Sequence, residues 1–277
     1  MSSHSEESQM ILLHNQDCIA GMGKRLKASS VDVVVTSPPY NIGVKYSSYD
    51  DTMPRQEYLD WLDSWAGGVK RVLTNEGSLF LNIGSKPSEP EIPYEVLAVM
   101  KRHFRLQNII HWIKSIYIES GSYGQKTDIN VGHYKPINSD RFINDTHEYI
   151  FHLTQTGNVK LDRLAIGVPY KDKTNIERWN NGGKELRCRG NCWFIPYRTI
   201  QKREKDRPHP ASFPPELAEK CILLHGLKKN LLVMDPFMGI GNTALAAKKL
   251  GTRFIGFELD SYYYKKARRA LEDPNLQ

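Results

Sequence analysis

Leu231-Leu-Val-Met-Asp-Pro-Phe-Met-Gly-Ile-Gly-Asn-Thr243 has the pattern of a strand, a glycine-containing loop and the start of a helix. Its first five residues form an apolar run typical of a buried strand, and a helix is predicted from Asn242 to Leu250. Gly239 and Gly241 allow the backbone to turn sharply between these elements and to approach a ligand closely. A second strand is predicted at Arg253–Glu258. This order of elements indicates an α/β fold.

The acidic residues around this loop predict the kind of ligand that it binds. Glu258 ends the second strand 19 residues after Gly239, the spacing at which a carboxylate accepts hydrogen bonds from ribose hydroxyls. Asp235 stands directly before the loop, where it would repel a phosphate but could hold an ammonium group. Together they predict an adenosine-containing cofactor at the carboxyl ends of parallel strands, and they favour S-adenosylmethionine over a pyrophosphate cofactor.

A second α/β unit lies earlier in the chain. Val31–Thr36 is a β-branched run that predicts a buried strand, and an amphipathic helix is predicted from about Pro54. A further strand is predicted at Ser78–Ile83, so the strands on either side of the helix should be parallel, with a right-handed crossover. The middle of the chain, about 114–206, has weaker periodicity, with one strand-like run at Glu148–Leu153.

Ser37-Pro-Pro-Tyr40 follows the first of these strands directly, and it suggests a chemistry. The exocyclic nitrogen of a base is a poor nucleophile because its lone pair is delocalised into the ring. The Ser37 hydroxyl and the Pro38 carbonyl could accept its two hydrogens and localise that lone pair. The Tyr40 ring could stack on a base flipped out of a duplex, and the prolines, Pro38 and Pro39, would preorganise the site.

These motifs together resemble the beta-type amino methyltransferases of nucleic acids, which use S-adenosylmethionine and act on cytosine N4 or adenine N6. Thr36–Tyr40 is similar to their catalytic motif, in the serine form linked with cytosine N4. Asp235–Gly241 is similar to their cofactor motif, and Phe254–Glu258 to their ribose-binding strand. His209–Pro214 is similar to the segment beside the methionine half of the cofactor. Asn15–Cys18 is similar to a motif that contacts adenine, except that Gln16 replaces the usual glycine.

The resemblance implies a Rossmann-like fold with a seven-stranded, mostly parallel sheet and helices on both faces. It implies a catalytic half at 10–113, a target-recognition insert at 114–205 and a cofactor-binding half at 206–277. The catalytic residues would be Ser37, Pro38, Pro39 and Tyr40. Cofactor contacts would come from Asp17, Thr36, His209, Ala211, Phe213, Asp235, Pro236, Phe237, Gly239, Gly241, Asn242, Thr243, Glu258 and Leu259.

The charge of the chain suits a polyanionic partner. Its 277 residues carry a formal net charge of +7. A basic stretch with interspersed aromatic residues predicts nucleic-acid binding, although a solvated face over core aromatics remains an alternative. It comprises Arg187, Arg189, Arg198, Lys202, Arg203, Lys205 and Arg207, with Trp193, Phe194 and Tyr197.

Other features narrow the setting. The four cysteines, Cys18, Cys188, Cys192 and Cys221, form no disulfide framework or metal-site pattern, and no apolar run of about 18 residues occurs. We therefore expect a cytoplasmic protein without a metal and without a membrane segment. Relatives with these motifs are often dimeric, so a homodimer is an open alternative.

Rival activities explain less of the sequence. Cytosine C5 methylation needs a thiolate that typically follows a proline, and none of the cysteines does so. A nicotinamide oxidoreductase would leave Ser37–Tyr40 unexplained, and a non-catalytic DNA-binding module has no use for a cofactor pocket. DNA is the preferred substrate, in a restriction–modification setting; cytidine in structured RNA such as rRNA and adenine N6 in DNA remain alternatives. His147 and Glu148 are interpreted as structural or substrate-facing.

Overall fold

The computed structural model describes residues 10–44, 51–121, 126–132, 137–178, 185–196 and 212–273. Its helices are α1 (Cys18–Arg25), α2 (Arg55–Val72), α3 (Ile92–Met100), α4 (Thr174–Arg178), α6 (Pro215–His225), α7 (Asn242–Lys249) and α8 (Ser261–Glu272). Its strands are β1 (Ile11–Asn15), β2 (Val31–Thr36), β3 (Leu73–Ile83), β4 (Arg105–Ile113), β5 (Ser115–Ile118), β6 (Ile129–Gly132), β7 (His147–Thr154), β8 (Val168–Pro169), β9 (Leu186–Arg187), β10 (Cys192–Phe194), β11 (Leu232–Asp235) and β12 (Arg253–Glu258). Within these ranges, no helix combines the length and apolarity that a membrane crossing needs.

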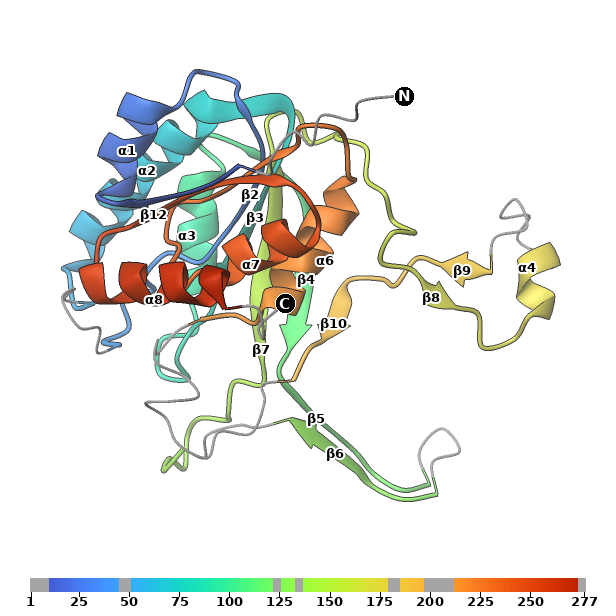
Figure 1. The fold of residues 1–277 in the computed structure, drawn as a ribbon. Coiled ribbons are helices and arrows are strands. Elements are labelled where there is room, and N and C mark those ends of the chain that lie inside the picture. Colours follow the sequence, from blue (N-terminus) through green and yellow to red (C-terminus); the bar gives the residue numbers. More distant parts are fainter. Residues whose placement is uncertain are drawn as a thin grey trace, which may run out of the picture.

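One large sheet organises the chain, with the strand order β1-β12-β11-β2-β3-β7-β4-β10 (Figure 1). Neighbouring strands are parallel except at β7, which is antiparallel to both β3 and β4. The expected mostly parallel α/β fold is thus confirmed. The sheet has eight strands in the described residues rather than the expected seven. One strand that the sequence did not predict is β10, which has three residues. Its buried Trp193 stands opposite the buried Trp112 of β4 in the strand register.

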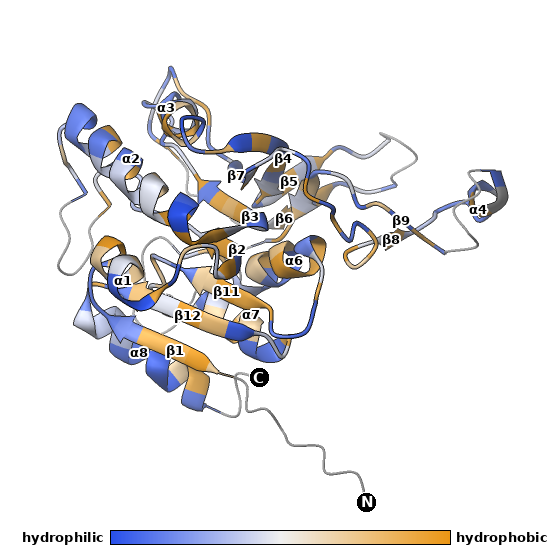
Figure 2. Cartoon of the chain, turned by 90° about the horizontal axis from the view of Figure 1, so that it is seen from above, coloured by the Kyte–Doolittle hydropathy of each residue, from blue (hydrophilic) through white to orange (hydrophobic). Residues whose placement is uncertain are grey.

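Helices cover both faces of this sheet, because its strands are apolar on both sides (Figure 2). Val34 of β2 faces a buried cluster that includes residues of α1, α2 and α3. Val33 and Val35 face the opposite cluster, which includes residues of α6, α7 and α8. The helix predicted from about Pro54 is α2, and Pro54 is its N-cap.

The region 114–205, expected to be an insert, contributes to the main sheet as well as projecting from it. Two of its strands, β7 and β10, are members of the large sheet. The β5–β6 hairpin and the β8–β9 pair with α4 extend away from the sheet (Figure 1). The strand-like run at Glu148–Leu153 lies within β7. Whether the projecting parts recognise a target stays a prediction.

The chain order creates a switch point between β11 and β2. These strands are parallel neighbours, and the chain proceeds from β2 to β3 on one side and from β11 to β12 on the other. A crevice forms at the carboxyl ends of such a strand pair, where α/β proteins bind ligands. The segment after β2 and the glycine-containing loop after β11 therefore meet, although they are about 200 residues apart in the sequence.

Gly256 of β12 tests how tightly this edge is packed. An added Cβ would lie 2.6 Å from Met238 Sδ, in the loop after β11, and 2.7 Å from Phe254 Cε1. We expect Gly256→Ala to lower the free energy of unfolding by about 1–3 kcal/mol through overpacking. Gly23 of α1 has nothing within 4 Å of an added Cβ, so Gly23→Ala should instead raise that free energy by about 0.5–1 kcal/mol. Urea unfolding measures both, and an equal effect of the two substitutions would contradict the tight packing.

Candidate active site

A cavity with about 1080 Å³ of empty space, its open mouth included, lies at the switch point. Its walls come mainly from the segments that follow β1, β2, β11 and β12, and also from α2 and the segment before α6. Of the predicted site residues, it is lined by Asp17, Ser37, Pro39, Phe213, Asp235, Pro236, Phe237, Gly239, Asn242, Glu258 and Leu259. Thr36, Pro38, Tyr40, Gly241 and Thr243, which the structure also describes, are not part of the lining. The sequence therefore predicted which loops meet at the cavity, but not every side chain that reaches it.

Asp235, at the end of β11, joins the two halves of the site. Its Oδ1 accepts a hydrogen bond of 2.6 Å from Thr36 Oγ1 and one of 3.1 Å from the Phe237 N–H. Its Oδ2 accepts one of 2.6 Å from Thr243 Oγ1 at the start of α7. Thr36 and Thr243 are fully buried, which explains why they support Asp235 without lining the cavity. The carboxylate predicted to hold an ammonium group is largely engaged by the protein itself.

Burial raises the pKa of Asp235 to about 6, and the hydrogen bonds from Thr243, Thr36 and Phe237 oppose that rise. The ionised carboxylate is costly in the interior, and its three donors reduce this cost.

Glu258, at the end of β12, is held by backbone donors. Its Oε2 accepts a hydrogen bond of 2.8 Å from the Gly239 N–H, and its Oε1 accepts one of 2.8 Å from the Asp260 N–H. Burial raises the pKa of Glu258 to about 7, while the hydrogen bonds to Asp260 and Gly239 lower it. The side chain still lines the cavity, so it is accessible to a ligand there; its hydrogen bonds with ribose hydroxyls stay a prediction.

The two glycines of the loop have different tasks. Gly239 has a φ of 54°, lines the cavity and donates to Glu258. Gly241 has a φ of 89° and caps α7, and a Cβ there would lie 3.0 Å from the Cβ of Ala267 in α8. Gly239 therefore lies at the cavity, where its contact with a cofactor stays a prediction, whereas Gly241 allows α7 to pack against α8.

An aromatic wall closes one side of the cavity. The Phe237 ring lies with its centroid 5.5 Å from that of Trp61 and 5.3 Å from that of Trp65, both on α2. Trp61 was not predicted, because it lies outside the apolar face of α2. The available signal in the sequence was a large aromatic residue directly beside that face. The lining residues that sequence reasoning missed are Gln16, Cys18, Met53, Trp61, Ser212, Met238, Ile240, Phe257, Asp260 and Tyr263.

The described lining is acidic. Asp17, Asp235, Glu258 and Asp260 contribute carboxylates, and no lysine, arginine or histidine occurs among the described residues that line the cavity. Asp17 and Asp260 also cap α1 and α8, through hydrogen bonds of 2.8 Å from the Ala20 N–H and 2.7 Å from the Tyr262 N–H. A cavity of this charge suits a cationic ligand and opposes a pyrophosphate.

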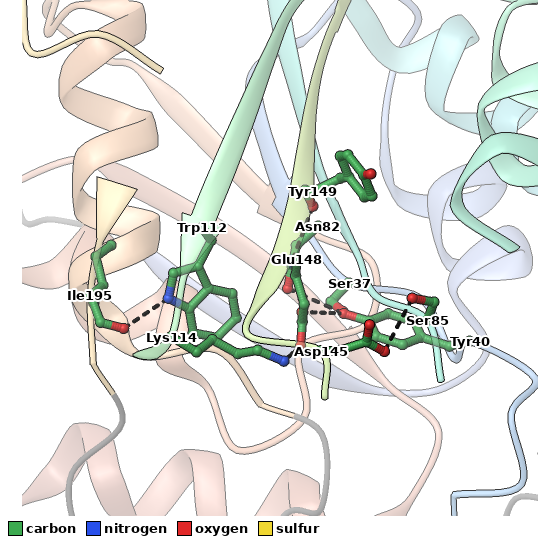
Figure 3. Close-up of polar contacts among 10 residues, drawn as sticks. All are labelled: Ser37, Tyr40, Asn82, Ser85, Trp112, Lys114, Asp145, Glu148, Tyr149 and Ile195. Carbon is green, nitrogen blue, oxygen red and sulfur yellow. Dashed lines mark hydrogen bonds and ion pairs between the residues drawn. The ribbon is translucent and has the colours of Figure 1, made fainter. Parts of the chain in front are cut away.

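The predicted catalytic motif, Ser37–Tyr40, forms the edge of the cavity beside β2. Ser37 and Pro39 line it, and the Pro39 carbonyl accepts a hydrogen bond of 2.7 Å from Tyr58 Oη on α2. Tyr40 is only 8% exposed, and its hydroxyl donates to Glu148 Oε2 at 3.0 Å (Figure 3). Its ring belongs to the core in this structure, so its stacking on a base stays a prediction. Glu148, interpreted as structural or substrate-facing, contacts the motif directly.

The predicted nucleic-acid-binding residues are only partly described. Arg187 lies exposed on β9, and Arg189 Nε donates to the Ile166 carbonyl at 2.9 Å. Trp193 is a core residue, with 1% of its surface exposed. Five predicted site residues, Arg198, Lys202, Arg203, His209 and Ala211, lie outside the described residues. Nucleic-acid binding by the basic stretch stays a prediction.

Comparison with known proteins defines the class. The DNA methylase family of N6/N4 methyltransferases matches residues 31–269, and the chain belongs to this family. It is 30% identical over 252 residues to the type II methyltransferase M.BglII of Bacillus subtilis, covering 88% of this chain but 64% of that protein. It is 28% identical to the DNA adenine methyltransferase YhdJ of Escherichia coli, covering 90% of this chain and 79% of YhdJ.

Solved structures show the same fold. The PvuII DNA methyltransferase, described as cytosine-N4-specific, superposes with a TM-score of 0.67 at 20% identity, covering 98% of this chain and 89% of that one. TTHA0409 of Thermus thermophilus, solved in complex with S-adenosyl-L-methionine, gives a TM-score of 0.60 at 24% identity, covering 96% of this chain and 95% of that one.

The hydrogen bonds of Asp235 make a prediction about stability. Asp235→Ala would leave buried donors on Thr36, Thr243 and Phe237 without this acceptor, which should cost about 1–3 kcal/mol. Asp235→Asn keeps an acceptor and removes the buried charge, so its free energy of unfolding at pH 8 should stay close to that of the wild type. Denaturant unfolding measures both variants. Equal losses in the two would show that the hydrogen bonds do not stabilise this edge.

Proposed function

We propose that this protein transfers the methyl group of S-adenosylmethionine to an exocyclic amino group of a DNA base, with cytosine N4 as the preferred target. The observation that carries this proposal is the meeting of two features at one switch point. An acidic cavity, with no cationic side chain in its described lining, opens directly beside Ser37. Family membership supports the same reaction class.

The residues present fit S-adenosylmethionine. The aromatic wall around Phe237 and Trp61 suits an adenine ring, and the Glu258 carboxylate suits ribose hydroxyls. The acidic lining suits a ligand with a sulfonium and an ammonium group, and it disfavours a nicotinamide dinucleotide. When bound, S-adenosylmethionine supplies an electrophilic methyl group. TTHA0409, which shares this fold, was solved with that molecule.

Ser37 would act on the nucleophile. It lies on the edge of the cavity, so its Oγ can accept one hydrogen of the target amino group. The carbonyl of Pro38, which is not part of the lining, would accept the other. Both contacts would localise the nitrogen lone pair toward the cofactor side of the cleft. The bond from Tyr58 to the Pro39 carbonyl holds this turn in place before the base arrives.

The target base is the finer part of the proposal. The serine form of the motif favours cytosine N4, and the structural relative from the PvuII system is cytosine-N4-specific. YhdJ, a sequence relative, is an adenine methyltransferase, so adenine N6 is the alternative outcome. Several relatives are type II methyltransferases, which supports a role beside a restriction enzyme. Exposed Arg187 would contribute to DNA binding.

Methyl transfer itself is the direct test. Purified protein with isotopically labelled S-adenosylmethionine should label duplex DNA, and nucleoside mass spectrometry should identify N4-methylcytosine. Ser37→Ala should lower kcat about five- to tenfold, because one hydrogen bond of about 1–1.5 kcal/mol is lost. Ser85→Ala, on a nearby segment outside the cavity lining, serves as the control. Detection of N6-methyladenine instead would change the assigned target base to adenine. Labelling of rRNA but not of DNA would overturn the assignment of DNA as the substrate.

Cofactor binding should depend on pH through Glu258. Its pKa of about 7 in the free protein reflects burial, and ribose hydroxyls donate more strongly to the ionised carboxylate. Binding should therefore lower this pKa, release a proton and tighten by up to about tenfold between pH 6 and pH 8. Glu258→Gln should bind more weakly at pH 8. Any titration of the ligand affects binding to both proteins equally, so the difference between their pH profiles in calorimetry reports on Glu258 alone. Identical pH profiles for the two proteins would contradict this role.

A further inference from the structure

A chain of polar contacts links Ser37, through the buried Tyr40, to Glu148 and Lys114 (Figure 3). Ser37 Oγ donates to Tyr40 Oη at 2.8 Å, and Tyr40 Oη donates to Glu148 Oε2 at 3.0 Å. Glu148 Oε1 in turn accepts from Lys114 Nζ at 3.1 Å. These four residues come from the segment after β2, from β7 and from the segment after β4, so tertiary structure assembles the chain.

The direction of every hydrogen bond in this chain is determined. Glu148 pairs with Lys114, and their side chains are 13% and 16% exposed, so the carboxylate is an acceptor held beside a cation. Asn82 Nδ2 donates to Glu148 Oε2 at 3.0 Å and to the Tyr149 carbonyl at 3.1 Å, which turns its Oδ1 toward Tyr40 at 3.2 Å. Tyr40 thus faces two acceptors. Its single hydrogen points toward them, and its oxygen accepts from Ser37.

The direction of these hydrogen bonds determines what Ser37 can offer to a group in the cavity. Because the Ser37 hydrogen is directed to Tyr40, only lone pairs of Ser37 Oγ remain for a group inside the cavity. An amino group donates to such an oxygen, whereas a keto oxygen at the same place would meet lone pairs without a hydrogen between them. A free serine hydroxyl would rotate to suit either group. The chain therefore turns Ser37 from an adaptable group into an acceptor.

We propose that Glu148 is a positioning residue that determines specificity. Acting through Tyr40, it makes Ser37 Oγ accept a hydrogen bond from bases with an amino group and disfavours bases with a keto group at the same ring position. This proposal rests on the proposed function and deepens it. Glu148 does not touch the base in this role. Its carboxylate, which is paired with Lys114, sets the direction of hydrogen bonds two contacts away.

Glu148→Gln is the sharpest test, because it keeps the shape of the side chain. Lys114 would attract the amide oxygen, and the amide NH₂ would then face Tyr40 and donate to it. Asn82 Nδ2 now donates to that position of Glu148, so the Asn82 amide would turn over and also present its NH₂ to Tyr40. The hydrogen-bond chain would then reverse, with Tyr40 donating to Ser37 and Ser37 donating into the cavity. Asp145→Asn is the matched control: Asp145 accepts from Ser85 at 3.4 Å, on the segment leading into β7.

The measurement compares two duplexes that carry the mapped methylation site. One has the natural target base, and the other has its keto analogue, uracil for cytosine or hypoxanthine for adenine. We expect the wild type and Asp145→Asn to bind the natural duplex several-fold more tightly than the analogue. In Glu148→Gln this preference should shrink to less than twofold, and kcat should fall about tenfold. The dissociation constant of S-adenosylmethionine should stay within twofold, which shows that the variant is folded.

A double-mutant cycle separates positioning from a merely structural role. Tyr40→Phe breaks the chain at its centre, so adding Glu148→Gln to Tyr40→Phe should lower kcat less than twofold further. Independent, multiplying effects would overturn the proposal, and so would an unchanged base preference in Glu148→Gln. If the wild-type protein transfers no methyl group to DNA, the proposed function fails, and this role fails with it; normal wild-type transfer with an unaffected Glu148→Gln variant overturns the role alone.

Discussion

A buried carboxylate holds the ligand edge of this protein together. Asp235 ends β11 and accepts hydrogen bonds from Thr36 of β2 and Thr243 of α7. The strand that leads into Ser37 and the helix that follows the glycine-containing loop are therefore joined at one buried group. Such a group is unfavourable unless all its donors are present. The geometry of the rest of the site depends on these hydrogen bonds, since the cavity opens between the segments that the carboxylate connects.

The segment after β2 is fixed from both of its sides. Asp235 holds Thr36 on the side of the cofactor loop, and Glu148 reaches Tyr40 from β7 on the other. Two acidic groups thus frame four residues whose prolines already restrict the backbone. Preorganisation of this kind is what a methyl transfer to a weak nucleophile requires, because little of the binding energy then goes into ordering the catalytic groups.

Much of the fold could be predicted from sequence, since its strongest elements carry local signals. The β-branched run of β2, the apolar face of α2 and the strand–loop–helix at β11 and α7 each satisfy one periodicity or turn rule. The elements α3 and β4 were not predicted, and β10 is too short to show a pattern. β7 was recognised as a strand, but its antiparallel place between β3 and β4 has no local signature, because strand order depends on long-range packing.

Local sequence patterns were enough to predict the class of fold, the two loops at the cavity and the acids Asp235 and Glu258, because spacing along neighbouring strands places their ends at one edge. Tertiary structure alone decided what these residues contact. It turned the Asp235 carboxylate toward two threonines, buried the Tyr40 ring and brought Glu148, 108 residues further along, to its hydroxyl. Hydrogen-bond partners so distant in sequence are chosen by the packing of the whole sheet, and no local pattern encodes them.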